Sequence, residues 1–167
     1  MLKAAGLLFV FSCAALLGTA QARNLSQKER QLAQILEFTR QLTVYLKTSM
    51  APPRELIHRI AHQSALESCP LVQELDQTFS ESNDFRRNMN KAMATVGLSG
   101  TPAGEILSSL GDEIGVKPLE SQLSALPSAI VALERELETA RAKTAQYAPL
   151  YRRLGVLGGL LAVVLLV

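Results

Sequence analysis

The chain has two ends without any charged side chain, and this feature limits what it can fold into more than any other. Residues 4–22 and 154–167 contain no Asp, Glu, Lys or Arg, whereas 31 of the 32 charged residues lie between them. With 167 residues in all, the chain has room for one domain between its apolar ends. We therefore expect one domain over residues 23–153.

The charge balance of the middle region excludes one class of function. It carries 16 basic and 15 acidic side chains, because Lys3 is the only charged residue outside it. Domains that bind nucleic acid gather an excess of basic residues on one face. We therefore expect no nucleic acid as a partner.

Both apolar ends can be interpreted as membrane helices. As a helix, residues 4–22 rise about 28 Å, close to the roughly 30 Å thickness of a bilayer core. A helix over 148–167 reaches a similar length if Arg152 and Arg153 extend toward the membrane surface. We therefore expect transmembrane helices at 4–22 and 148–167, with the lipid bilayer as a partner.

The amino-terminal segment also fits a signal peptide with a cleavage site at Ala20-Gln21-Ala22. In that alternative, the protein is an exported helical binding protein held only by its carboxy-terminal helix. The distribution of basic residues favours retention of both segments. Most basic residues near the two apolar segments lie on the domain side of them, and basic residues beside membrane helices stay in the cytosol. The residues expected to flank the membrane are Lys3, Arg23, Arg152 and Arg153.

Small residues recur four apart in both ends, at Ala14 and Gly18 and at Gly155 and Gly159. Such pairs allow membrane helices to approach closely. Glycine is also common in membrane helices that make no such contact. Both interpretations stay open at this point.

The middle region predicts helices only, since no stretch alternates apolar and polar residues with period two. A capping box at Ser26 and Glu29 predicts the start of a first helix that ends before Pro52-Pro53. The next predicted helices begin at Pro53, Leu71, Phe85 and Pro102, and the second ends near residues 68–70. Their expected caps and terminators are Asn83 or Asp84, Gly97, Thr101 and Gly115.

A sixth helix is predicted from a heptad pattern of apolar residues between Leu119 and Leu154. Pro127 and Pro149 should kink it. The pattern indicates either a coiled-coil contact with a partner or a long helix packed in its own bundle. The second interpretation is favoured, because the pattern tapers to Ala140 and Thr144.

Glu55, His58 and His62 lie on one face of the second predicted helix and are a candidate metal site. Arg59 shares this face and would repel a cation, so a solvated or partner-facing surface is the favoured interpretation. Further charged positions are expected first as solvated helix surface and second as partner contacts. These are Arg86, Arg87, Glu134, Arg135 and Glu138.

Enzymatic chemistry has little support in the sequence. There is no G-x-x-x-x-G-K-[ST] loop for a nucleotide, and both histidines lie on one helix face away from any Ser-His-Asp pattern. The two cysteines, Cys13 and Cys69, cannot form a disulfide framework. We therefore expect a protein without enzymatic activity and without a cofactor.

Several segments together resemble the stage III sporulation protein AB family of endospore-forming bacteria. They are the Met1-Leu2-Lys3 start, residues 105–115, the long helix with Gln122 and Leu133-Glu134, and the closing run 154–161. Pro127 and Pro149 depart from the family pattern. The family-signature positions are Leu107, Leu110, Gly111, Gly115, Leu133, Gly155 and Gly159.

This resemblance implies a fold and a role. Members of the family resemble the cytoplasmic helical domain of the inner-membrane platform protein of type II secretion and type IV pilus machines. This likeness implies an all-α six-helix bundle. Together with the apolar ends, we expect the bundle to be flanked by an amino-terminal and a carboxy-terminal membrane helix. The resemblance also implies a scaffold in the mother-cell membrane around the forespore, with the main domain in the cytosol. The implied partners are a cytoplasmic ATPase of the same sporulation complex and other membrane proteins of that complex. Association with further copies of the chain is a separate expectation.

Overall fold

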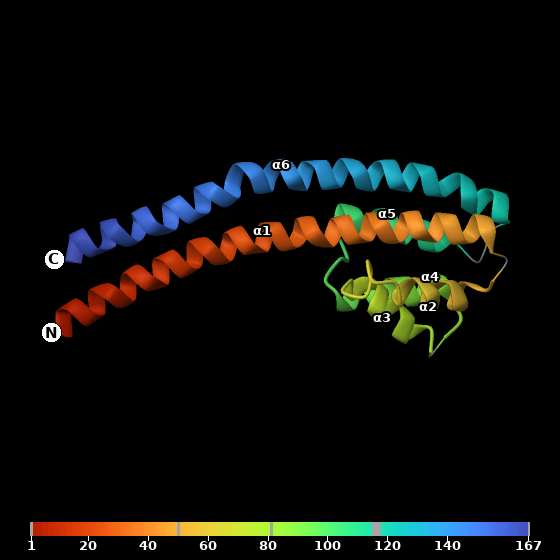
Figure 1. Cartoon of the computed structure of the whole chain (residues 1–167), viewed down its shortest axis with the longest axis horizontal. Coiled ribbons are helices and arrows are strands. Elements are labelled where there is room, and N and C mark those ends of the chain that lie inside the picture. Colours follow the sequence, from red (N-terminus) through yellow and green to blue (C-terminus); the bar gives the residue numbers. More distant parts are fainter. Residues whose placement is uncertain (1, 50, 81, 115–117, 167) are drawn as a thin grey trace. The chain divides into compact units, whose positions relative to one another are not determined.

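The computed structural model describes residues 2–49, 51–80, 82–114 and 118–166, and these residues form six helices and no strand. Figure 1 shows the order of the helices along the chain. They are α1 (Leu2–Thr48), α2 (Pro53–Ala61), α3 (Pro70–Thr78), α4 (Phe85–Thr95), α5 (Pro102–Glu113) and α6 (Leu119–Leu166). The expected all-α class with six helices is confirmed.

The helices divide into two compact units. Unit 1 combines the first part of α1, up to Arg30, with the last part of α6, from Glu138 onward. Unit 2 extends from Gln31 to Leu137 and contains the rest of both long helices together with α2 to α5.

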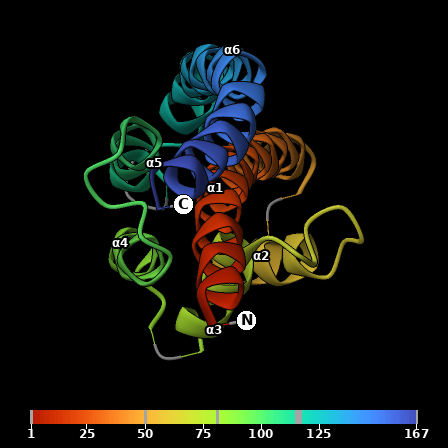
Figure 2. The same ribbon diagram turned by 90° about the vertical axis from the view of Figure 1, so that its left-hand side faces the viewer.

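Unit 2 is a helical bundle with an aliphatic core. Its largest fully buried side chains include Phe38 and Phe79, and the others are mostly Leu and Ile. The short helices pack in chain order, α2 on α3, α3 on α4 and α4 on α5, and Figure 2 shows α4 and α5 as neighbours. The heptad residues Leu126 and Leu133 of α6 belong to this core. In unit 2, the heptad pattern therefore packs α6 into the chain's own bundle.

The helix starts in unit 2 follow from local chemistry. The Asp84 carboxylate accepts a hydrogen bond from the backbone N–H of Arg87 at 3.2 Å, and the Thr101 hydroxyl accepts one from that of Gly104 at 3.1 Å. Gly97 follows α4 with a φ of 72°, which glycine adopts without steric cost. Asp84, Thr101 and Gly97 thus have the predicted roles, whereas Gly115 lies outside the described residues.

Two predicted boundaries are wrong. The capping box at Ser26 does not start a helix, because α1 is continuous from Leu2 and the Ser26 hydroxyl donates to the carbonyl oxygen of Ala22 at 3.2 Å. The second helix stops at Ala61 instead of near residue 68. There the side-chain amide of Gln73 donates to the carbonyl oxygen of Ala61 at 2.9 Å, which satisfies one of the acceptors left at the end of α2.

Candidate functional sites

Unit 1 is an antiparallel pair of helices with a regular register (Figure 1). The Arg141 guanidinium lies 3.8 Å from the Glu29 carboxylate, and the Thr144 hydroxyl donates to the carbonyl oxygen of Leu25 at 3.4 Å. Gly18, seven residues before Leu25, lies against Tyr151, seven residues after Thr144. The contacts therefore extend along both helices.

The two helices of unit 1 approach each other closely at two glycines. A Cβ atom at Gly18 would lie 2.5 Å from the carbonyl oxygen of Tyr151 and 2.9 Å from the Cα of Gly155. Ala22, one turn from Gly18, is fully buried, and Ala148 is 8% exposed. The inner face of the pair thus consists of small residues, and Gly18 and Gly155 meet directly.

The outer face of unit 1 carries large apolar side chains. Its exposed members are Leu16, Leu17, Tyr147, Leu150, Tyr151, Leu154, Val156, Leu157, Leu160 and Leu161. A pair of helices in water normally buries its large apolar residues and exposes polar ones. The described part of unit 1 exposes these large apolar side chains together with charged ones such as Arg23, Arg152 and Arg153.

The expected membrane-flanking residues lie in these helices. Arg23, Arg152 and Arg153 are exposed, and Lys3 lies in α1 in a stretch whose side chains are not described. Among the described residues, no helix combines the length and the apolar character needed to cross a membrane. Membrane crossing by residues 4–22 and 148–167 stays a prediction.

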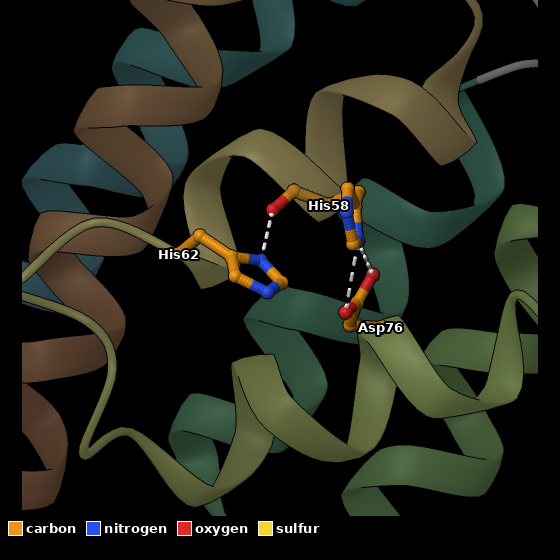
Figure 3. A group of neighbouring side chains, drawn as sticks. All are labelled: His58, His62 and Asp76. Carbon is orange, nitrogen blue, oxygen red and sulfur yellow. Dashed lines mark hydrogen bonds and ion pairs between the residues drawn. The ribbon is translucent and has the colours of Figure 1, made fainter.

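A second candidate site joins α2 and α3 in unit 2. One potential ligand atom from each of His58, His62 and Asp76 lies within 4.8 Å of the other two. Figure 3 shows the three side chains together. Nδ1 of His58 is 3.2 Å from each carboxylate oxygen of Asp76, and Nδ1 of His62 is 2.9 Å from the carbonyl oxygen of His58. A surface pocket of about 460 Å³ adjoins His58 and Asp76.

The structure changes the predicted composition of this site. Glu55 is not part of the cluster, because its carboxylate accepts from the Arg59 guanidinium at 2.6 Å. Asp76 of α3 takes the place expected for Glu55. Sequence spacing could not show Asp76, which lies 18 residues from His58 and reaches it only through the packing of α3 on α2.

The charged positions expected as partner contacts differ in their surroundings. Arg86 pairs with Asp112 at 2.8 Å, and Glu134 pairs with Arg40 at 2.7 Å. Both pairs are solvent-exposed, so each contributes at most about 1 kcal/mol. Arg87, Arg135 and Glu138 are exposed helix residues.

The family-signature residues are mainly packing residues. Leu107, Leu110 and Leu133 lie in the core of unit 2. Gly111 is buried, and a Cβ atom there would lie 3.7 Å from the Cα of Arg86 on α4. In unit 1, Gly155 contacts Gly18 and Gly159 is buried.

The described residues therefore define an all-helical protein, with a helical bundle and a close pair formed by the ends of its first and last helices. The family model for stage III sporulation protein AB matches residues 3–167, and the chain belongs to this family. Its role accordingly lies in sporulation. No curated protein and no solved structure gives a match to this chain.

Proposed function

We propose that the protein is a non-enzymatic membrane scaffold of a sporulation channel complex, anchored in the mother-cell membrane at both ends of its chain. The observation that carries this proposal is the arrangement of unit 1, with small residues inside and large apolar residues outside. Lipid solvates large apolar side chains, so membrane helices associate through small residues that bring their backbones together. The pair of Gly18 and Gly155 fits this mode of association.

The position of the main domain follows from the charges near the two ends. Arg23 closes one uncharged segment, and Arg152 and Arg153 precede the other. The bias of basic residues toward the cytosol supports a cytosolic position for unit 2, with both termini on the opposite side of the membrane. Ala22, the end of the signal-peptide alternative, is fully buried inside the continuous helix α1, which favours retention of residues 1–22.

The anchoring is tested by a charge on the outer face of unit 1. Leu157→Arg replaces a side chain that is 60% exposed, and Val131→Arg is a matched control on the same helix, 47% exposed but in unit 2. Because a charge within the bilayer costs about 2–4 kcal/mol, Leu157→Arg should increase the fraction that alkaline carbonate extracts from sporangial membranes, and Val131→Arg should not. Equal extraction of both variants would contradict the anchoring.

Mechanical coupling is the proposed mode of action. Helix α6 is continuous from Leu119 to Leu166 and includes residues of both units. A force that a cytoplasmic ATPase applies to unit 2 would then pass along α6 to the membrane partners of the complex. Glycines inserted after Ala145 should abolish sporulation, whereas the same insertion after Ser99, in the loop between α4 and α5, should be tolerated. Normal sporulation with the first insertion would refute coupling through α6.

A further inference from the structure

The cluster of His58, His62 and Asp76 has no part in the proposed scaffold function. We propose that these three side chains bind one divalent transition-metal ion of the Zn²⁺ type, which links α2 to α3. Imidazole nitrogen and carboxylate oxygen are common ligands of Zn²⁺. The described donor atoms already lie within 4.8 Å of one another.

The distance between His58 and Asp76 fits two ligands of one ion. Ligands at 2.0–2.1 Å from a tetrahedral Zn²⁺ are separated by about 3.3 Å. Nδ1 of His58 is 3.2 Å from both carboxylate oxygens of Asp76. The ligand atom of His62 lies within 4.8 Å of the other two, and its side chain is exposed, so a small shift of the three side chains brings their ligand atoms to one ion.

The hydrogen bond of His62 leaves the correct nitrogen available. Its Nδ1 lies 2.9 Å from the carbonyl oxygen of His58, an acceptor, so Nδ1 carries the proton. In the neutral imidazole of this tautomer, the lone pair of Nε2 is free to bind an ion. A backbone carbonyl that holds the second nitrogen is the usual outer partner of a metal-bound histidine.

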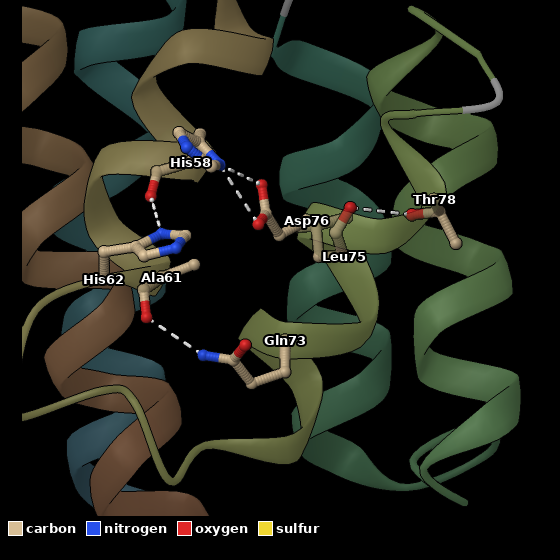
Figure 4. A network of polar contacts seen from close by, with 7 residues as sticks. All are labelled: His58, Ala61, His62, Gln73, Leu75, Asp76 and Thr78. Atoms are coloured by element: carbon tan, nitrogen blue, oxygen red, sulfur yellow. Dashed lines mark hydrogen bonds and ion pairs between the residues drawn. The ribbon is translucent and has the colours of Figure 1, made fainter.

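The backbone positions of the three residues are fixed by packing. His58 and His62 lie one turn apart on α2, whose opposite face buries Leu56, Ile57 and Ile60. On α3, Leu75 is buried beside Asp76. The hydrogen bond from Gln73 to the carbonyl oxygen of Ala61 ties the end of α2 to α3 within the same region (Figure 4).

The charges around the cluster permit a cation. The Asp76 side chain is only 21% exposed, and among the described residues its sole ion-pair partner is His58. Arg59, the residue expected to repel a metal, is paired with Glu55. Arg54 lines the adjoining pocket and is exposed to solvent, which screens its charge.

The donor set also determines the class of metal. Two of the three ligands are imidazoles, which suit Zn²⁺ and similar transition metals, whereas Ca²⁺ and Mg²⁺ require oxygen ligands. Water would complete the coordination shell on the exposed side.

The test uses the full-length protein without a histidine tag, in detergent, after treatment with a chelator. Zinc binding is measured by competition with a chromogenic chelator for the parent protein and for His58→Ala, His62→Ala and Asp76→Asn. Glu55→Gln is the matched control, because Glu55 lies on the same face outside the cluster. The unfolding midpoint without metal confirms that each variant folds.

We expect one Zn²⁺ per chain and a rise in the unfolding midpoint on adding zinc. Each cluster variant should lose affinity by about tenfold or more, because even an outer partner of a metal ligand is worth about 10–100-fold, and Glu55→Gln should bind as the parent does. Failure of the parent protein to bind zinc would overturn the proposal, and so would zinc affinity that Asp76→Asn leaves unchanged.

Discussion

Gly18 of α1 lies so close to Tyr151 of α6 that a Cβ atom would come within 2.5 Å of the Tyr151 carbonyl oxygen. The obstacle is backbone, which cannot rotate away as the end of a side chain can. Gly158 of α6 differs, because a Cβ atom added there would meet no further atom within 4 Å. The two glycines therefore allow a direct comparison inside unit 1.

Gly18→Ala should force the two helices of unit 1 apart, at a cost of about 1–3 kcal/mol for overpacking. Gly158→Ala should leave the pair unchanged. The measurement is the crosslinking yield between cysteines placed at Leu25 and Thr144, in membranes from strains with Cys13→Ala and Cys69→Ala. A yield that falls equally in both variants, or in neither, would contradict the described packing.

A second pair of glycines tests the packing of α5 in unit 2. A Cβ atom at Gly104 would overlap the carbonyl oxygen of Leu98, whereas at Gly111 its nearest neighbours would be 3.7 Å away. Gly104→Ala should lower the free energy of unfolding by about 1–3 kcal/mol. Gly111→Ala should be neutral or stabilise by up to about 1 kcal/mol, because alanine favours the helix. Urea denaturation in detergent measures both, and the reverse order of stability would show the close approach to be absent.

The start of α4 offers a test of one hydrogen bond. Asp84→Ala removes the carboxylate that caps the backbone N–H of Arg87 and should cost about 1 kcal/mol of stability. Asn83→Ala changes the exposed neighbouring residue and should have little effect. The same denaturation experiment checks this prediction. A larger loss of stability for Asn83→Ala than for Asp84→Ala would show that Asp84 is not the capping residue.

Cys69 should report on the integrity of unit 2 through its thiol. It is fully buried beside α3, and burial raises the pKa of Cys69 above its ordinary value of 9.0. The folded protein therefore disfavours the thiolate, so the stability due to the neutral thiol is present below the ordinary pKa and is lost as the pH rises above it.

Two measurements check this account in a Cys13→Ala background. A thiol reagent should label Cys69 only as the protein unfolds. With Cys69→Ala as the comparison, stability should fall more steeply in the protein that retains Cys69 as the pH increases through about 9. Rapid labelling of the folded protein would show that Cys69 is accessible.

Local chemistry made much of the fold predictable. Prolines at the first turns of α2, α3 and α5, and polar caps at Asp84 and Thr101, mark helix starts that depend on neighbouring residues only. The buried faces of these helices follow equally from the spacing of apolar residues. Leu107, Leu110 and Leu133 accordingly lie in the core.

Contacts between distant residues were not predictable in the same way. Ser26 has the local pattern of a cap, yet the helix continues because the residues before it pack against α6 and their backbone groups bond within α1. Asp76 joins His58 and His62 only because α3 folds back on α2. The meeting of Gly18 with Gly155 likewise depends on a register between two helices that no single segment encodes.

The intact mass of the protein from membranes of sporulating cells tests the central claim most directly. If both ends anchor the scaffold, the measured mass includes residues 1–22, apart from changes at the initiating methionine, and the protein resists alkaline extraction. A mass that corresponds to a chain starting at Arg23 would contradict double anchoring, because the segment that carries Gly18 would be missing from the mature protein.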